Sequence, residues 1–291
     1  VREFFDVEML DQARGVVPEN IDVLVVAQPA ALRPATAYAI DQYAMKGGKV
    51  IALLDPAPES AQVVMLSQDR KGLTVFNKLL KGWGVQYDPT KVTADIRHAR
   101  RVQFPTRPGD KPLVTDFVAW LVLDKKSMDE RDVLSGGIEQ LSFGSAGSLS
   151  KADGASITFT PLVQTSNEAM QIGAEKVGMG ADPLALIRNY KSEGKRLTLA
   201  ARLTGDAVSA FPNGEPSVDE DDTLNPGVVK SDEMKAAEAA TKQSGPGKDH
   251  VASGKINAVV IADTDFLANQ FWVQNREVMG QQMQVPIAHN A

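Results

Sequence analysis

The chain has 291 residues, and its 31 Lys and Arg against 37 Asp and Glu give a net charge of −6 at pH 7. With 43% hydrophobic and 23% charged residues, it has the composition of an ordinary soluble globular protein. Its acidic balance argues against a protein that binds nucleic acid by neutralising phosphates. The length allows one large α/β unit or two domains.

The residue types that are scarce limit the chemistry further. The sequence has no cysteine, which excludes thiol nucleophiles, thiolate metal sites and disulfides. Its only histidines are His98, His250 and His289, so a multi-histidine metal centre is not expected. No window reaches the roughly 18 apolar residues that a membrane-spanning helix needs, and the first residues lack the pattern of a signal peptide.

The first third of the chain predicts a strand, a helix and a second strand. Residues 21–27 form an apolar, β-branched run, which predicts a parallel strand buried on both faces. Residues 34–46 have apolar side chains at helical spacing, with Pro34 at the start and two glycines after the end. Residues 50–54 give the next buried strand. This order is typical of a right-handed crossover between parallel strands.

The rest of the chain mixes helices and strands. One helix is predicted at 73–81 and another after Asp182. Candidate strands include 117–123, 157–160, 197–204 and 258–262. The fold class predicted from this order is α/β, with a mainly parallel, flavodoxin-like sheet sandwiched by helices and an additional β-rich segment.

The predicted domain organisation is one domain over residues 1–291. A division into two subdomains stays open, with an α/β part at 1–90 plus 255–291 and a mixed part at 91–204. Residues 205–254 are rich in Pro, Gly, Ser and acidic side chains, which predicts an acidic, flexible insertion.

Three glycine-containing segments resemble motifs that bind nucleotides or carry a catalytic nucleophile, but their residues do not have the spacing that these motifs require. The run at 144–148 has no Ser flanked by glycines two residues away on both sides, so it is no nucleophile elbow. The glycines at 178–180 and at 47–48 lack the remaining glycines of a dinucleotide fingerprint and a phosphate loop. No catalytic residue and no cofactor is predicted.

Acidic side chains follow two of the predicted buried strands. Asp263 and Asp265 come after the last strand, and Asp55 ends an earlier one. Ligands bind at the carboxyl ends of strands in open parallel sheets. The three carboxylates could hold a divalent cation, or they could cap the following helix and bond loop amides. The second interpretation is favoured, and no metal site is assigned.

Other strand ends carry uncharged polar residues. Gln28 follows the first strand, and Thr165 and Ser166 follow the strand at 157–160. Together with the carboxylates, they make up the predicted ligand- or partner-binding set, chosen by position. These residues are Gln28, Asp55, Thr165, Ser166, Asp263 and Asp265. The basic patch Arg97–Arg101 is interpreted as a solvated edge or a partner contact.

Several segments together resemble a known family. They are Ile21–Val26 with Pro29, Ile40–Tyr43, Gly47–Val50, Asp55-Pro56, Pro161–Ser166, Ala200–Gly205 and Val259–Leu267. In this order they resemble the auxiliary domain of uncharacterised ABC-type transport systems, which includes gliding-motility-associated auxiliary proteins. The resemblance implies a glutamine-amidotransferase-like fold on the periplasmic side, anchored to the inner membrane by helices outside this segment. It also implies ABC permease and ATPase subunits as partners.

The leading functional prediction is therefore a non-enzymatic, extracytoplasmic domain of an ABC transport complex. It would bind a protein partner or an exported substrate. Two alternatives stay open. One is a divalent-metal-dependent hydrolase or transferase that uses the strand-end carboxylates. The other is a carbohydrate-binding module, marked by exposed Trp120 or Trp272 near a groove.

Overall fold

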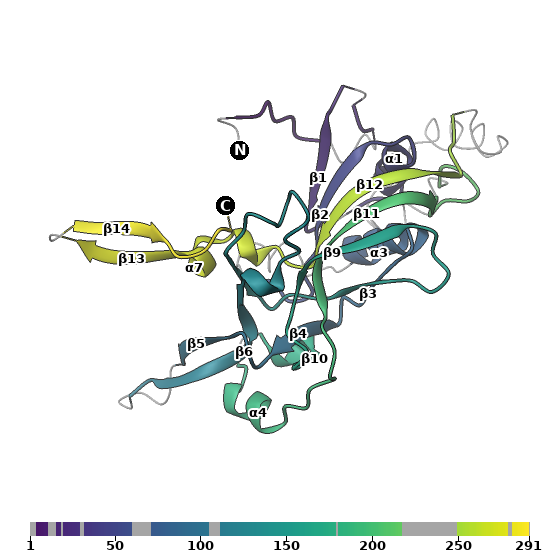
Figure 1. Ribbon diagram of the computed structural model, residues 1–291. Coiled ribbons are helices and arrows are strands. Elements are labelled where there is room, and N and C mark those ends of the chain that lie inside the picture. Colours follow the sequence, from purple (N-terminus) through teal and green to yellow (C-terminus); the bar gives the residue numbers. More distant parts are fainter. Residues whose placement is uncertain are drawn as a thin grey trace, which may run out of the picture.

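The computed structural model describes most of the chain. The described residues are 4–10, 16–18, 20–29, 32–59, 71–104, 111–178, 180–216, 249–278 and 281–290. Of these residues 38% lie in strands and 19% in helices, so strands dominate the architecture (Figure 1). The strands form one seven-stranded sheet, one three-stranded sheet and two two-stranded sheets.

The seven-stranded sheet is the centre of the molecule. Its order is β1-β2-β12-β11-β8-β3, and β9 also pairs with β11. Its strands are β1 (Val23–Ala27), β2 (Lys49–Leu53), β3 (Val85–Tyr87), β8 (Leu149–Lys151), β9 (Thr158–Gln164), β11 (Thr198–Val208) and β12 (Ser253–Ile261). Strands β1, β2 and β12 run parallel, whereas β12, β11 and β9 alternate in direction. The sheet therefore joins a parallel half to an antiparallel half.

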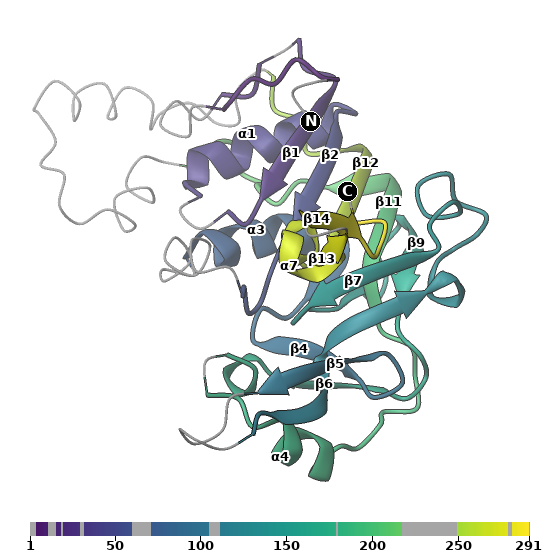
Figure 2. The ribbon, with the colours of Figure 1, turned by 90° about the vertical axis from the view of Figure 1, so that its left-hand side faces the viewer.

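Two helices cover one face of the parallel half (Figures 1 and 2). Helix α1 (Pro34–Met45) begins at a proline and is followed by Gly47, whose φ of 90° suits a glycine. Helix α3 (Lys71–Gly82) packs beside it, and apolar residues of both helices share one core with those of β2 and β12. The α1 helix reaches the sheet closely because Gly254 of β12 has no side chain, and a Cβ there would lie 1.9 Å from the Met45 carbonyl oxygen.

A second sheet covers the opposite face of the antiparallel half. It contains β5 (Ala99–Phe104), β6 (Leu113–Asp124) and β7 (Gln140–Gly144), all antiparallel. Leu121 and Leu123 of β6 and Phe143 of β7 form one buried cluster with Leu199 and Ala200 of β11. The core on this side is thus formed between two sheets.

A smaller unit continues below the two sheets. Strands β4 (Lys91–Asp95) and β10 (Ala169–Gly173) pair antiparallel, and α4 (Pro183–Arg188) packs against β6. Asp182 caps α4, because its carboxylate accepts a hydrogen bond from the Ala185 N–H at 2.9 Å. A third buried cluster, which includes Val92, Phe117 and Ile172, holds this unit together. Short 3-10 helices follow β6 and β10 at Lys125–Ser127 and Ala174–Lys176.

The chain after β12 forms an arm. A 3-10 turn (Asp265–Leu267) and the short helix α7 (Asn269–Trp272) lead into the hairpin of β13 (Val273–Val278) and β14 (Gln281–Pro286), which projects from the body (Figure 1). The hairpin is closed at its base, because Ile287 N–H donates to the Trp272 carbonyl oxygen. The Asn290 side chain then bonds both main-chain groups of Ser142 in β7.

The predicted fold class is wrong. The structure is not a helix-sandwiched parallel α/β fold of the flavodoxin or glutamine-amidotransferase kind, because strands predominate and mixed and antiparallel sheets form the core. A buried apolar strand has the same residue pattern whether its neighbours run parallel or antiparallel, since burial on both faces selects apolar residues in either case. The pattern likewise could not show that a second sheet, rather than helices, covers one face.

One strand is less buried than its composition predicts. Residues 21–27 were expected to be covered on both faces, but Val23 is 42% exposed and Val25 is 58% exposed. Leu24 between them is buried against the α1 side of the sheet. The other face of β1 is therefore open in the described structure.

The predicted insertion at 205–254 lies partly outside the described residues, which stop at 216 and resume at 249. Its described ends belong to β11 and β12 and the turns next to them. In the part of the chain that the structure describes, no helix is long and apolar enough to span a membrane.

Candidate functional site

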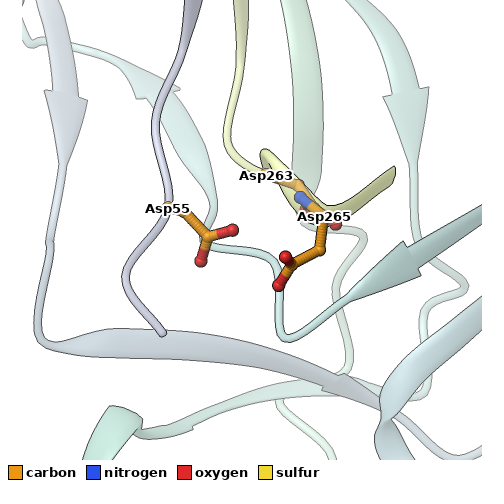
Figure 3. A group of neighbouring side chains, drawn as sticks. All are labelled: Asp55, Asp263 and Asp265. Carbon is orange, nitrogen blue, oxygen red and sulfur yellow. Dashed lines mark hydrogen bonds between the residues drawn. The ribbon is translucent and has the colours of Figure 1, made fainter. Parts of the chain in front are cut away.

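The carboxyl ends of the parallel strands bring four of the six predicted residues together. Gln28 follows β1, Asp55 follows β2, and Asp263 and Asp265 follow β12. Figure 3 shows the three aspartates, which face one another from two adjacent strand ends. The convergence arises because β1, β2 and β12 are parallel neighbours, so their carboxyl ends share one edge of the sheet.

Gln28 joins the ends of β1 and β2. Its side-chain amide accepts from the Asp55 N–H at 2.8 Å and donates to the Asp55 carbonyl oxygen at 3.1 Å. Gln28 has a φ of 41°, in the left-handed region that non-glycine residues seldom occupy. Gln28 therefore fixes the backbone of Asp55 through two hydrogen bonds, and the Asp55 carboxylate accepts hydrogen bonds from other donors.

Asp55 and Asp263 are buried and bond the surrounding loops. The Asp55 carboxylate accepts from the Ala57 N–H at 2.9 Å and from both the N–H and the hydroxyl of Thr264, at 3.0 and 2.9 Å. The Asp263 carboxylate accepts from the Gly144 N–H at 2.8 Å and from the N–H groups of Asp265 and Phe266. These are the loop-amide contacts that the capping interpretation expects.

Asp265 and Glu59 link a third loop to the group. Asp265 accepts a hydrogen bond from the Glu59 N–H at 2.6 Å. The Glu59 carboxylate in turn accepts from Trp120 Nε1 at 2.9 Å and from the Ser145 hydroxyl at 2.6 Å. Glu59, Trp120 and Ser145 were not predicted as site residues. The signal that could have found Glu59 is its place in the same strand-end loop as Asp55.

Burial and neighbouring carboxylates raise the pKa of two of the three aspartates, Asp55 and Asp263. Asp55, Asp263 and Asp265 each offer one oxygen that lies within 4.8 Å of the other two, and all three side chains are buried. Burial, followed by repulsion from Asp265, raises the pKa of Asp55 to about 7. Burial and the charges of Asp55 and Asp265 also raise the pKa of Asp263 well above its usual range. The group can therefore retain a proton near neutrality or accept a divalent cation.

The glycine-rich run at 144–147 packs tightly around this group. A Cβ on Gly144 would lie 2.2 Å from the Phe271 ring, and one on Gly147 would lie 2.7 Å from the Tyr87 ring. Ser145 is buried with a φ of 55°, and its hydroxyl donates to Glu59 rather than to a histidine. The described contacts of the histidines lie elsewhere, at Asp95, Tyr38 and Gln140. Among the described residues, Ser145 therefore does not form a serine–histidine pair.

The other two predicted residues belong to a separate network. Strand β9 ends at the same edge of the sheet, but β11 lies between it and β12. Thr165 is buried and bonds the start of β11, because its hydroxyl accepts from the Leu197 N–H at 2.8 Å. Ser166 donates to the Asp95 carboxylate from its N–H at 2.7 Å and from its hydroxyl at 2.8 Å.

Asp95 is the centre of this second network. His98 Nδ1 lies 2.7 Å from the Asp95 carboxylate, and the Arg97 N–H donates to it at 3.0 Å. Burial opposes ionisation, but the hydrogen bonds from His98 and Ser166 outweigh it and lower the pKa of Asp95 to about 2. Asp95 and His98 were not predicted as site residues. Serine and histidine both bond the same carboxylate, so they do not form a nucleophile–base pair.

The basic patch Arg97–Arg101 is divided between different contacts. Arg97 forms an exposed ion pair with Glu168 at 3.8 Å. The Arg100 guanidinium donates to the carbonyl oxygens of Gln270 and Phe271 and lies over the Phe271 ring.

The two tryptophans that would mark a carbohydrate site are only partly exposed. Trp120 packs edge-on against Phe271, and the Trp272 ring nitrogen donates to a main-chain carbonyl.

Comparison with protein-family models matches residues 1–291 to the family described as "ABC-type uncharacterized transport system". The match covers the whole chain and confirms the resemblance found in its strand and turn segments. No curated protein matches the chain. No solved structure matches it either.

Proposed function

We propose a binding function, because the chain belongs to the ABC-type uncharacterized transport system family and is an auxiliary component of such a system. In this proposal it is a non-enzymatic domain that contacts a protein partner or an exported substrate of the transport complex. The permease is the expected direct partner, and the ATPase would be recovered through it. The expected location is the extracytoplasmic side, with anchoring to the inner membrane by segments outside this chain.

One observation carries the proposal: the buried aspartates tie three loops into one platform. Asp263 bonds Gly144, the last residue of β7, where the next loop begins. Asp55 bonds the loop after β12 through Thr264, and Asp265 bonds the loop after β2 through Glu59. Loops fixed in this way keep one shape without a partner, which lowers the entropy cost of binding. The aspartates are thus positioning residues, not contact residues.

The platform presents an apolar side chain to solvent. Leu267 is 50% exposed and lies two residues after the buried Asp265. A large apolar side chain on a rigid loop is suited to a pocket on a protein partner. We therefore expect Leu267 to be a contact residue and the loop from Asp263 to Leu267 to be the centre of the interface.

The test is a pull-down from membranes with the full-length, anchored protein and identification of the co-purified subunits by mass spectrometry. Leu267→Asp should lose the permease and ATPase. Val133→Asp is the matched control, because Val133 is an exposed apolar residue in a turn that belongs to none of the three loops. Recovery of neither subunit by the unchanged protein would contradict the proposal, and equal recovery by both variants would contradict the assignment of the interface.

Bound divalent metal is a second candidate, favoured by the distance among the three carboxylates. Their oxygens lie within 4.8 Å of one another, which suits shared coordination of Mg²⁺, Mn²⁺ or Ca²⁺ in a hydrolase or transferase. Micromolar metal should then raise the thermal midpoint of the chain but not that of Asp265→Asn. An unchanged midpoint for the original chain would remove this candidate.

A further inference from the structure

The outer strand of the parallel half has the apolar composition of a buried strand, but one of its faces is exposed and one of its edges is unpaired in the described structure. Strand β1 lies at the end of the sheet order and pairs only with β2 among the described strands. Its sequence Val-Leu-Val-Val-Ala has no charged or polar residue. Val23 and Val25 are exposed on one face, beside the half-buried Ile51 of β2. Parallel strands of this composition are normally covered on both faces.

Two other boundary strands of the molecule carry protection that β1 lacks. Strand β5, at the edge of the three-stranded sheet, contains Arg100 and Arg101. Strand β9, which pairs only with β11 among the named strands, contains Pro161. Charged side chains and proline prevent edge-to-edge pairing in natural sheets. Strand β1 has neither. Strands β3, β7 and β10 have neither as well, but β3 has only three residues, the β7 edge bonds the side chain of Asn290, and the β10 edge bonds Glu193. Among these edges, β1 is therefore the one best suited to accept another strand.

The same chain contains a segment that matches this edge. In residues 5–9, the apolar side chains of Phe5, Val7 and Met9 alternate with Asp6 and Glu8. Alternation of this kind is typical of a strand with one apolar face. The segment belongs to no helix or strand, and all five side chains are exposed, with Phe5 at 66% and Met9 at 78%. It projects from the body without pairing with β1 (Figure 1).

We propose that two copies of this chain associate by strand exchange, with residues 5–9 of one copy paired along β1 of the other. The apolar side chains of the segment would extend the surface of Val23 and Val25. Asp6 and Glu8 would lie on the opposite side of the added strand. Because β1 has no charged residue, the added acids meet no like charge within it.

A second copy is the partner that fits best, because the chain carries both halves of the contact. A two-fold dimer would cover both exposed apolar features in both copies at once and would close on itself. Any other partner would have to supply a separate match for each of them. Main-chain hydrogen bonds along β1 would provide affinity, and the valine side chains would set the register. This inference does not depend on the proposed transport partner.

The absence of cysteine makes a direct test possible. Val7→Cys and Val25→Cys are made separately in chains of different tag length, mixed, oxidised and separated on a non-reducing gel. A disulfide between the two chains should form at least about tenfold faster than with Val208→Cys in place of Val25→Cys. Val208 is the control, because it is also an exposed valine but lies on β11, separated from β1 by two strands.

Sedimentation of the unchanged chain gives an independent readout. We expect a concentration-dependent dimer, at least about tenfold weaker for Val25→Lys but not for Val208→Lys, with unchanged circular dichroism for both variants. Equal disulfide rates in the mixing experiment, or a strictly monomeric chain, would overturn the proposal. A disulfide that forms only within a single chain carrying both Val7→Cys and Val25→Cys would also overturn it and would indicate pairing within one copy.

Discussion

Buried aspartates lie in two separate groups of hydrogen-bonded residues at strand ends of this molecule, and the pKa of Asp55 in the first group and that of Asp95 in the second move in opposite directions. The pKa of Asp55 rises to about 7, whereas that of Asp95 falls to about 2. Asp55 accepts bonds from neutral groups and lies beside two further carboxylates. Asp95 accepts bonds from a serine and an imidazole. Burial alone therefore does not decide the charge of a carboxylate, since the neighbours determine it.

The comparison predicts the largest loss of stability at Asp95. Asp95→Ala should lower the free energy of unfolding by about 3 kcal/mol or more, because Ser166, His98 and the Arg97 N–H lose a buried acceptor. Urea unfolding at pH 7 measures the change. Asp124→Ala is the control, since the Asp124 side chain is exposed and lies 4.0 Å from the His98 ring. A loss no larger than the control would show that Asp95 is not the centre of its network.

The pH dependence of stability tests the other group. Because the folded pKa of Asp55 is about 7 instead of 3.8, the folded state holds its proton more tightly than the unfolded state. This contribution to stability is complete below pH 3.8 and is lost as the pH rises to about 7. Between these two pH values, the free energy of unfolding should fall by up to about 1.4 kcal/mol per pH unit because of Asp55.

Asp55→Asn should remove this part of the slope, as measured by urea unfolding at several pH values between 5 and 8. Asp124→Asn should retain it, because the Asp124 carboxylate is exposed. Equal slopes for Asp55→Asn and the unchanged chain would show that Asp55 does not hold the raised pKa.

A smaller effect is expected from one hydroxyl in the Asp95 network. Ser166→Ala removes the 2.8 Å hydroxyl bond and keeps the N–H bond, so it should cost about 1–2 kcal/mol at pH 7. The folded pKa of Asp95 is lowered, so this stabilisation is present above pH 3.8 and disappears as the pH falls towards 2. The difference between variant and unchanged chain should shrink over that range. A difference independent of pH would indicate a packing effect instead.

The smallest effect is expected at the rim of the same network. Arg97→Ala removes an exposed ion pair to Glu168, 3.8 Å long, and leaves the Arg97 N–H bond to Asp95 intact. The unfolding free energy should change by less than about 0.5 kcal/mol. A larger loss would mean that the exposed charge, and not the buried hydrogen bonds, stabilises Asp95.

The first group could be predicted from the sequence because its geometry follows from local strand patterns. Apolar runs identified β1, β2 and β12, and the residues after parallel neighbours meet at one sheet edge. Gln28, Asp55, Asp263 and Asp265 are therefore close together, as their positions suggested. Their burial was not visible from position, because it depends on the loops after β2 and β7 folding over them.

The second group could not be predicted in the same way. Ser166 and Asp95 are 71 residues apart, and their contact depends on the pairing of β4 with β10. The hydrophobic periodicity of one segment does not show which distant residue will be its hydrogen-bond partner. The fold class failed for the same reason, because the sheet of β5, β6 and β7 that covers β11 is separated from it in sequence. The residues of one segment predict that it forms a strand. They do not predict the direction of its neighbours or which element packs on its faces.

The hydrogen bonds of α1 have a consequence for how the chain can be divided. Asp41 accepts from the Ser209 hydroxyl and Gln42 bonds the main chain of Val251, so one helix holds both the end of β11 and the start of β12. Strand β12 then lies between β2 and β11 in the sheet. Residues 1–248 and 249–291, expressed as separate polypeptides, should therefore reassemble by fragment complementation, with β12 as the inserted strand.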